Sequence, residues 1–570
     1  MKINRSNLLN ICMFVLLLIV GMFFSVNMKN ENNWDFANYH YYNAFAFLHN
    51  RLNYDIVPAS VNTFFNPLID LPLYFYIQHF NDNVDLIYAL QGIWGGLLLF
   101  VFYKIYLLFF KTESWIDYVF LGLALIISIS GQATFYQIGA STNEIPIAFF
   151  MLWGFYILLK MVKFPLSQKI WKFFIAGLIM GIGLGFKQTS VTYCLAAGLS
   201  LIICRKYLNK PFKSIFYFAL GGLLGYFVIN GYFMYKYFVL YGNPFFPFLN
   251  GIFHSPYFDN FNYTDRRFIP SIEKFLIYPF LWNFSKYSVA ETTYIDLRLT
   301  FVYLFLLIFP IVILKKKNLS QFVEQHRVIV YSFIFLFLSF FLWMGVFSIL
   351  RYAVVIEVLS TLVFIKIIQY LFLKPQKLIL PICSIVFLFL ILLIPIYNGG
   401  WGKYRGDNNQ FFEMEKIKLP ENTLLKLYGF PSAFVVPEFA KHASVQALGY
   451  MQYNCEHQKG SDFVERGAFR AMRDKIEKEH KGPVAIIWFN NAFFQKNQIP
   501  LNTYKQNLIK CKETPSCFIN FCETSDKTIE IMLNIPNDYF CRPLKNNIEK
   551  RLNICVPEEF KKQILGEEND

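Results

Sequence analysis

Long apolar runs alternate with short polar segments over the first two thirds of the chain. Several runs reach the length of about twenty residues that an α-helix needs to cross a bilayer. Two neighbouring runs, 171–186 and 189–204, are shorter, and we expect them to form a tight hairpin. The pattern predicts an all-α polytopic bundle of about eleven transmembrane helices. They are expected at approximately 8–27, 85–109, 115–135, 145–162, 171–186, 189–204, 214–240, 297–314, 328–347, 353–373 and 378–397.

The start of the chain resembles a signal peptide, because the basic segment Met1–Arg5 precedes an apolar run from Leu8 to Val26. A signal peptide would end at a small-x-small cleavage site. The residues that follow, Gly21–Met28, read GMFFSVNM and contain no such site. We therefore expect the first run to be an uncleaved transmembrane helix.

Basic residues between the runs predict the orientation, because short cytoplasmic loops of membrane proteins are enriched in Lys and Arg. With the N-terminus in the cytoplasm, every alternate short loop is basic, and an odd number of spans places residues 398–570 outside. We expect a multi-pass protein of the plasma (inner) membrane. The basic residues of the predicted cytoplasmic loops are Lys104, Lys111, Lys160, Lys163, Lys169, Lys172, Arg205, Lys206, Lys210, Lys213, Lys315, Lys316, Lys317, Arg327, Lys374 and Lys377.

Composition supports a membrane protein and argues against nucleic-acid binding. The chain is 55% hydrophobic and 16% charged, whereas soluble domains carry about 25% charged residues. The net charge of +15 is concentrated in residues 1–397, since residues 398–570 hold 24 Lys and Arg against 22 Asp and Glu. Basic loops that set topology explain this excess, so we expect no nucleic-acid partner.

Three large segments are expected outside the cytoplasm. Loops at 28–84 and 241–296 belong to the bundle of residues 1–397, and residues 398–570 form a soluble domain. Strand-like runs and one polar helix predict an α/β or α+β fold for this domain. The strands are expected at Phe434–Pro437, Val484–Phe489 and Thr528–Leu533, and the helix near Phe463–His480.

Cysteines concentrate in the same domain. In an oxidising compartment an even number of cysteines indicates disulfides, although the pairing cannot be predicted. Without a CxxC pair or a His cluster, a metal site is not indicated. The six cysteines of the domain are Cys455, Cys511, Cys517, Cys522, Cys541 and Cys555.

The first outer loop carries the most informative pattern. Asp35 closely follows the first run, and in an α-helix over 36–49 Asp35, Tyr39 and Tyr42 would share a face. A carboxylate can take a proton from a sugar hydroxyl, and aromatic rings stack on apolar sugar faces. The alternative is an interfacial aromatic belt with an N-capping Asp.

Several motifs of the chain resemble those of one superfamily. The first loop reads Asp35-x-x-x-Tyr-His-Tyr-Tyr-Asn, followed by Asn66-Pro-x-x-Asp70, and Gly242–Asn250 reads GNPFFPFLN. Gly185–Thr189 and Arg351-Tyr352 each place a basic residue between apolar runs. In order and topology these segments resemble the type C (GT-C) superfamily of polytopic membrane glycosyltransferases, over about residues 1–397.

The resemblance implies transfer of a sugar from a polyprenyl-phosphate donor, with the base in the first outer loop. It implies catalytic roles for Asp35 and Asp70. An Asp-x-Asp metal motif is absent there, so neither a metal nor a cofactor is expected. The residues predicted to bind substrate, from this resemblance and from their places in the outer loops, are Tyr39, His40, Asn66, Glu144, Lys187, Asn243 and Arg351.

Lys187 and Arg351 are cations at the edges of predicted spans, where ionisable residues are costly and usually functional. A lipid-phosphate donor needs such cations to bind its phosphate and stabilise it as a leaving group. Snorkelling, or a structural pair between Arg351 and Glu357, is the alternative. For Glu144 the alternative is to complement the dipole of a helix that Asn143 caps. Solvation is the simpler interpretation of the loop charges Asp259, Asp265, Arg266, Arg267, Glu291, Asp296 and Arg298.

Two classes of function remain in view. The first is an inverting glycosyltransferase with Asp35 as base, acting on an extracytoplasmic glycolipid, polysaccharide or protein acceptor among membrane lipids. The second is a transporter or flippase for a lipid or polysaccharide, against which stands the absence of internal repeats. A third option is a ligase or acyltransferase on envelope glycans, but no His-centred motif in a predicted span supports acyl transfer.

Overall fold

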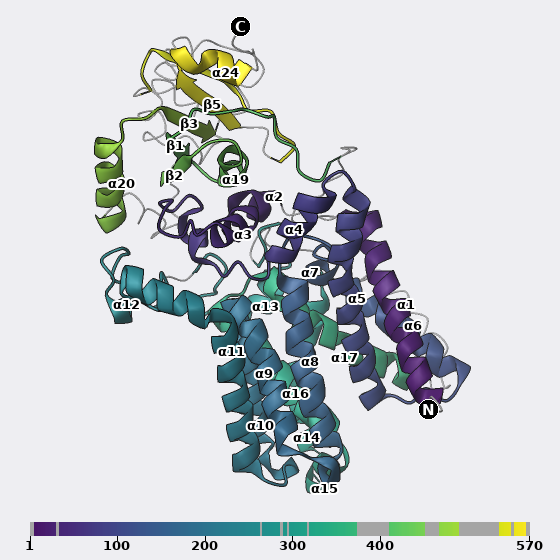
Figure 1. Cartoon of the computed structure of the whole chain (residues 1–570). Coiled ribbons are helices and arrows are strands. Elements are labelled where there is room, and N and C mark those ends of the chain that lie inside the picture. Colours follow the sequence, from purple (N-terminus) through teal and green to yellow (C-terminus); the bar gives the residue numbers. More distant parts are fainter. Residues whose placement is uncertain are drawn as a thin grey trace. The chain divides into compact units, whose positions relative to one another are not determined.

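We analysed a computed structural model of the chain (Figure 1). The predicted span at 378–397 and the predicted strand Thr528–Leu533 lie outside the residues that it describes. These are 5–29, 33–262, 265–284, 289–292, 296–315, 319–372, 410–450, 467–489, 535–548 and 552–565.

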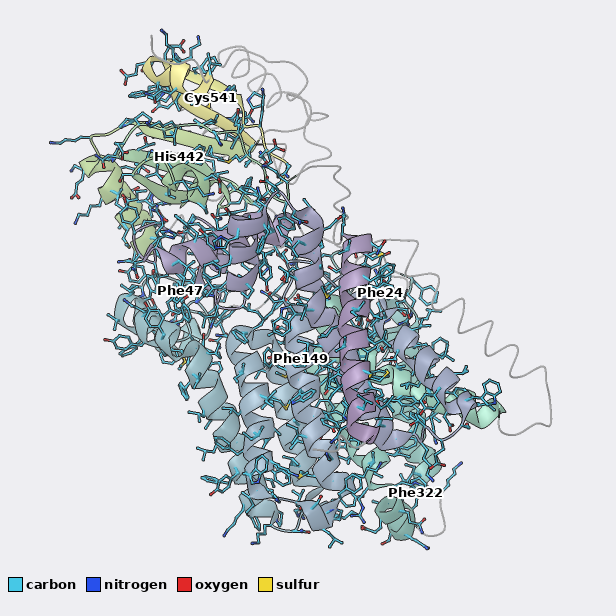
Figure 2. The ribbon with its side chains drawn as sticks, turned by 45° about the vertical axis from the view of Figure 1, so that its right-hand side comes forward. Phe24, Phe47, Phe149, Phe322, His442 and Cys541 are labelled. Atoms are coloured by element: carbon cyan, nitrogen blue, oxygen red, sulfur yellow. A yellow bond between two sulfur atoms is a disulfide. The ribbon has the colours of Figure 1, made fainter. Side chains whose placement is uncertain are left out.

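The chain forms two compact units. The helical unit comprises residues 1–32, 85–232 and 265–405, and the sheet unit comprises residues 33–84, 233–264 and 406–570. This division differs from the expected boundary after residue 397, because most of the first outer loop and part of the second group with the C-terminal residues. Side chains of both units are drawn in Figure 2, where Phe149 marks α8 of the helical unit and Phe47 marks α3 of the sheet unit.

Among the residues that the structure describes, the helical unit has five helices that are long and apolar enough to cross a membrane: residues 7–28 of α1, and α5, α8, α11 and α16. Shorter apolar helices cover 115–129, 170–186, 188–203 and 298–311, so a count of eleven spans remains a prediction. The helices are α1 (Arg5–Met28), α5 (Val84–Phe109), α6 (Trp115–Ile129), α7 (Gln132–Phe135), α8 (Glu144–Lys163), α9 (Ile170–Phe186), α10 (Val191–Ile203), α11 (Pro211–Tyr241), α13 (Tyr278–Leu281), α14 (Arg298–Leu314), α15 (Leu319–Gln325), α16 (Arg327–Val346) and α17 (Val354–Phe372).

Two details of the helical unit bear on the sequence predictions. The short runs at 171–186 and 189–204 form α9 and α10, joined by the 3₁₀ turn Gln188–Ser190, as expected for a tight hairpin. The run predicted at 115–135 is one helix only as far as Ile129, where α6 ends, and the separate turn α7 follows.

Glycines bring α9 and α11 into backbone contact. A Cβ added at Gly181 would lie 2.1 Å from the carbonyl oxygen of Gly222, and one at Gly221 would lie 2.0 Å from that of Phe174. Small residues that let helix backbones approach closely are typical of membrane helix pairs. The side chains of Leu223 and Val228 on α11 are instead exposed, at 58% and 66%. The close glycine packing and the exposed apolar face both fit a helix in contact with lipid.

The sheet unit contains a five-stranded sheet of order β2-β1-β3-β5-β4. The first three strands in this order are parallel, and the remaining pairs are antiparallel. A disulfide joins Cys541 and Cys555 across β4 and β5, which confirms the expectation of at least one. The strands are β1 (Thr423–Tyr428), β2 (Val445–Tyr450), β3 (Val484–Phe489), β4 (Tyr539–Pro543) and β5 (Leu552–Pro557).

The predicted strand Val484–Phe489 is confirmed as β3, and the predicted polar helix is α20 (Gly467–Glu479). The predicted strand Phe434–Pro437 is wrong, because the segment begins helix α19 (Val435–Ala440), which connects β1 to β2. Parallel neighbours need such a crossover, so a helix here follows from the pairing of β1 with β2.

The first outer loop is joined to the edge strand β2. The amide of Ile56 donates to the carbonyl of Ala447 over 2.9 Å, and the amide of Gly449 donates to Ile56 over 2.8 Å. A Cβ on Gly449 would lie 2.1 Å from the carbonyl oxygen of Val57, so only glycine permits this approach. The loop thus extends the sheet, which explains why it groups with the C-terminal residues.

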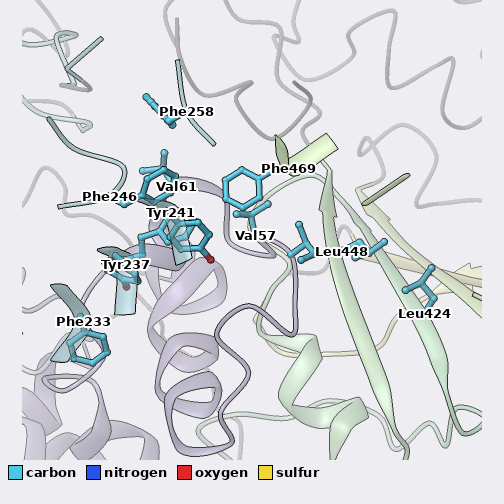
Figure 3. Close-up of a cluster of buried hydrophobic side chains, with 12 residues drawn as sticks. Val57, Val61, Phe233, Tyr237, Tyr241, Phe246, Phe258, Leu424, Leu448 and Phe469 are labelled. Atoms are coloured by element: carbon cyan, nitrogen blue, oxygen red, sulfur yellow. Dashed lines mark hydrogen bonds between the residues drawn. The ribbon is translucent and has the colours of Figure 1, made fainter. Parts of the chain in front are cut away.

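A hydrophobic core covers the same junction (Figure 3). It unites the first outer loop, the end of α11, the loop that follows α11, the sheet and α20. Burying these side chains together stabilises one body out of segments that lie far apart in the sequence. The core residues are Ile56, Val57, Val61, Phe64, Phe233, Tyr237, Tyr241, Phe246, Phe258, Leu424, Leu448 and Phe469.

Candidate functional site

Asp35 lies in a helical segment that contains a π turn. Helix α2 (Asn33–Asp35) runs into the π-helical residues Phe36–His40 and then into α3 (Tyr41–Leu48). A π turn bonds residues five apart instead of four, and such turns are frequent at functional sites. The extra residue breaks the α-helical period, so the expectation that Asp35, Tyr39 and Tyr42 share one α-helical face does not hold.

Asp35 is only 3% exposed and has helical backbone angles. Its side chain makes no capping hydrogen bond to the π turn that follows, so the alternative of an N-capping Asp is wrong for that turn. Tyr39 is also buried, with its ring centroid 4.0 Å from that of His40 and 5.3 Å from that of Phe65. Asp35 is therefore a buried carboxylate of the sheet unit, four residues before the packed ring of Tyr39.

His40 and Asp70 form a buried pair. The Nδ1 of His40 lies 2.7 Å from Oδ1 of Asp70, and the two side chains are 2% and 4% exposed. Since a carboxylate accepts, Nδ1 carries the proton and the imidazole is held in one tautomer. Two residues predicted from separate motifs, thirty positions apart, are thus brought together.

Tyr42 contacts a different carboxylate. Its hydroxyl donates to Oδ2 of Asp55 over 2.9 Å, and Arg51 binds both carboxylate oxygens of Asp55, at 2.6 and 2.8 Å. Burial, followed by the charge of Asp55, raises the pKa of Tyr42 well above its ordinary value, so its phenol stays a donor. Asp55 also accepts from the amide of Ala447, at 2.7 Å. This cluster fastens the loop to β2.

The two asparagines predicted to bind substrate shape their own loops. Asn66 Oδ1 accepts from the amide of Leu68 over 2.9 Å. The side chain of Asn243, fully buried, accepts from the amide of Phe245 and donates to the carbonyl of Phe248 and to Asn250. The GNPFFPFLN motif therefore has a structural role, and binding by these asparagines stays a prediction.

Lys187 and Arg351 lie on the same aromatic ring in the helical unit. The Nζ of Lys187 is 5.3 Å from the ring centroid of Tyr352, and the guanidinium carbon of Arg351 is 5.4 Å from it. Both distances allow cation–π attraction. The prediction that these two cations act together gains a geometric basis, because they come from the end of α9 and from the 3₁₀ turn Leu350–Ala353.

Each cation also has a carboxylate partner. Lys187 pairs with Glu144, whose side chain is 4% exposed, and Nε of Arg351 lies 3.2 Å from Glu291. Asn143 precedes α8 without a side-chain capping bond, so its predicted capping role is wrong. Glu144 belongs to a cluster of alternating charge around Tyr352.

No protein-family model and no curated protein matches this chain.

Glu357 takes part in a separate buried network. Its carboxylate accepts from the amide of Ala133 and from the amide and hydroxyl of Thr134, at 3.2, 2.7 and 2.6 Å. A Cβ on Gly131 would lie 1.9 Å from Cδ of Glu357, so a larger residue there would have to displace this carboxylate. These bonds of the Glu357 carboxylate therefore hold α7, whereas the alternative considered above paired Glu357 with Arg351.

The same turn is held from a second side by Asp296. Oδ2 of Asp296 accepts from the amide of Gln132, and Oδ1 lies 3.4 Å from Nε of Arg298. Arg298 also donates to the carbonyls of Ile127 and Ser130. The solvated interpretation of Asp296 and Arg298 is wrong, because both are 1% exposed. Gln137, just beyond α7, donates to the carbonyl of Arg351 over 3.2 Å, which links this network to the cationic cluster.

Asp265 adds a further charge near Arg351. Burial raises the pKa of Asp265, but hydrogen bonds and charge from Arg267, with a smaller contribution from Arg351, hold it below its ordinary value. Asp265 is therefore ionised at neutral pH. Among the described residues, no three His, Cys, Asp or Glu side chains are grouped to hold a metal ion.

Sequence reasoning did not identify Tyr352 as the shared ring, nor Glu291 as the partner of Arg351. Both residues lie in segments that the sequence places on the outer side of the membrane. The position of Tyr352 directly after Arg351, at the edge of a predicted span, could have indicated a ring beside the cation.

Proposed function

We propose that this protein is a membrane glycosyltransferase that moves a sugar from a polyprenyl-phosphate donor to an extracytoplasmic acceptor. The observation that carries the proposal is the convergence of Lys187 and Arg351 on Tyr352. A membrane-embedded phosphate needs fixed cations and a nearby apolar wall for its lipid. The partners Glu144 and Glu291 keep both cations in place before the donor binds.

In the proposed reaction the donor phosphate binds to the positive charges of Lys187 and Arg351. Its oxygens accept hydrogen bonds from Lys187 and Arg351, which are stronger than bonds between neutral groups. As the bond between the anomeric carbon and the phosphate oxygen breaks, negative charge grows on the leaving polyprenyl phosphate. Cations aimed at that charge lower the barrier without a metal.

The acceptor side of the reaction is assigned to Asp35 of the sheet unit. An acceptor hydroxyl gives its proton to the Asp35 carboxylate, and its oxygen forms the new bond to the anomeric carbon, which inverts the sugar. The burial of Asp35 supports a role in chemistry, because a water-poor environment strengthens electrostatic interactions. Asp35 and the two cations belong to different compact units, so the proposal for each needs its own test.

A reconstituted assay tests the function. The purified protein in lipid vesicles receives polyprenyl-phosphate sugars labelled in the sugar, together with extracted envelope glycolipids. We expect label to move to an acceptor. Lys187→Ala and Arg351→Ala should raise KM for the donor, with some loss of kcat. Lys213→Ala, which removes an exposed cation, is the matched control.

The competing function makes a different product. A flippase would move the labelled donor across the bilayer with its sugar still attached, and no acceptor would gain label. The donor would then become accessible on the other side of the vesicle membrane without chemical change. This result, with no sugar transfer from any donor tested, would favour a transporter over a glycosyltransferase.

The proposed topology places residues 398–570 outside the cytoplasm of a plasma (inner) membrane protein. Alkaline phosphatase fused at Asn408, a residue outside the described part of the chain, should be active. An inactive fusion there, with an active cytoplasmic reporter at the same position, would reverse the arrangement.

A further inference from the structure

The segment Ser271–Phe284 has one buried and one exposed apolar face. Tyr278, Pro279 and Trp282 are buried in the helical unit. The exposed face is made of large apolar side chains. Contiguous exposed apolar patches are uncommon on soluble proteins and mark sites of interaction. Its members and their exposed fractions are Ile272 (88%), Leu276 (64%), Ile277 (51%), Leu281 (37%) and Phe284 (88%).

The buried face fastens the segment to α14 and α16. The ring of Phe275 lies 6.2 Å from that of Phe341, and Trp282 lies 6.1 Å from Trp343. The Tyr303 hydroxyl donates to the carbonyl of Leu276 over 2.6 Å. The exposed face is therefore held in a fixed place on two apolar helices.

These contacts give the depth of the segment along the helices. Tyr303 is five residues from the start of α14 at Arg298, and Phe341 is five residues from the end of α16 at Val346. At about 1.5 Å per residue, both contacts lie about 7.5 Å inside those helix ends. Segments that lie in the membrane interface reach a depth of about 5–10 Å.

We infer that Ser271–Phe284 is a membrane-interface element whose exposed face is immersed in bilayer lipid. The occupant is lipid because α14, the helix that holds the segment through Tyr303, itself exposes large apolar side chains, with Ile308 and Ile311 at 53% and 56%. Helix α16 is long and apolar enough to cross a membrane. The charged neighbours Glu273 and Lys274 are exposed on the same segment, as expected at a boundary between lipid and water.

The inference does not depend on the proposed sugar transfer. The proposed interface segment does lie close in sequence to a residue of the cationic cluster. Val289 accepts from the amide of Leu350 over 2.7 Å, and Glu291, the partner of Arg351, follows two residues later.

Depth-dependent quenching tests the inference in the full chain. Ile272→Cys and Phe284→Cys are labelled with an environment-sensitive fluorophore and reconstituted in phosphatidylcholine vesicles. Arg266→Cys, at an exposed polar position of the same unit, is the matched control, and wild type carried through labelling gives the background from native cysteines. We expect blue-shifted emission at residues 272 and 284, strong quenching by lipids with a nitroxide high on the acyl chain, and several-fold weaker quenching by iodide than at residue 266.

Two results would overturn the inference. One is iodide quenching at residues 272 and 284 equal to that at residue 266, which would place the face in water. The other is protection of the labelled residues from both quenchers, together with disulfide cross-links between chains of the unlabelled Cys variants, which would show that a second copy covers the face. Because both substituted side chains are 88% exposed, the variants should fold normally, and a thermal unfolding scan verifies this.

Discussion

His40 and Asp70 are hydrogen-bonded through Nδ1 and Oδ1 at 2.7 Å, and both side chains are almost fully buried. A buried carboxylate that fixes a histidine tautomer is found both in cores and at catalytic sites. The two cases differ in what happens when the carboxylate is removed. A structural pair affects stability alone, whereas a pair that serves the site also affects the rate.

We predict that Asp70→Ala and His40→Ala each lower the free energy of unfolding, by about 1–3 kcal/mol, because each leaves a buried polar partner unsatisfied. The double variant should lose less than the sum, with a coupling energy of about 0.5–3 kcal/mol. Thermal or denaturant unfolding of the purified variants measures this. Additive losses would show that the two side chains do not depend on each other.

A second prediction concerns the junction between the first outer loop and β2. Gly449→Ala adds a Cβ that would lie 2.1 Å from the carbonyl of Val57. The loop or the strand must move, at a cost of about 1–3 kcal/mol. We expect a lower unfolding temperature and, if the sheet positions the Asp35 loop, a lower kcat with little change in KM for the donor.

Gly122→Ala is the matched control for Gly449→Ala. An added Cβ at Gly122 meets nothing within 4 Å, and Ala favours the helix in which Gly122 lies. Unfolding of Gly449→Ala at the wild-type temperature would contradict the close approach of Val57 to β2.

Local patterns in the sequence were enough to predict some of this architecture. The run Val484–Phe489 is a short apolar β-branched and aromatic stretch, and it forms a strand. The run Phe434–Pro437 has similar residues but forms a helix, because short apolar runs do not distinguish the two states without their neighbours. Its helical state follows from the parallel pairing of β1 with β2, which is a long-range property.

The candidate site shows the same limit. Lys187 and Arg351 were predicted individually from their places at the ends of apolar runs. Their common ring and their partners Glu144 and Glu291 depend on contacts between residues that are distant in sequence. The π turn at Phe36–His40 was also not predicted, because π turns are rare and the sequence pattern favoured an α-helix there. The Arg51–Asp55 pair is close in sequence, but residues 51–55 form a turn, so the i and i+4 rule for helices does not predict it.

A third prediction concerns the disulfide between Cys541 and Cys555. Mass spectrometry of protein isolated without reductant should find a peptide cross-linked through these two residues. Replacing both by Ser should lower the free energy of unfolding by about 2–4 kcal/mol, because the unfolded chain gains freedom. Cys12→Ser, which removes an exposed free thiol, should have no such effect. Free thiols at both positions in protein from an oxidising compartment would contradict the pairing.

The last prediction concerns Asp35. If its carboxylate is the base, Asp35→Asn should lower kcat by about 10²–10⁴, the range of general acid–base catalysis. Because Asp35 is 3% exposed, an effect on folding has to be measured separately, by thermal unfolding of the same preparation. Asn keeps the size of the side chain, so the unfolding temperature should change little.

The explanation of Asp35 as a helix cap predicts the opposite, since Asn caps a helix about as well as Asp. The structure contradicts that explanation for the π turn, because the side chain of Asp35 makes no capping bond to it. Transfer at the wild-type rate by a stable Asp35→Asn protein would therefore exclude Asp35 from the chemistry. Asp70 would then be the next candidate, since it already orients His40 in the same unit. Loss of transfer in Asp70→Asn, with His40→Gln equally inactive and both proteins folded, would assign the base to that pair.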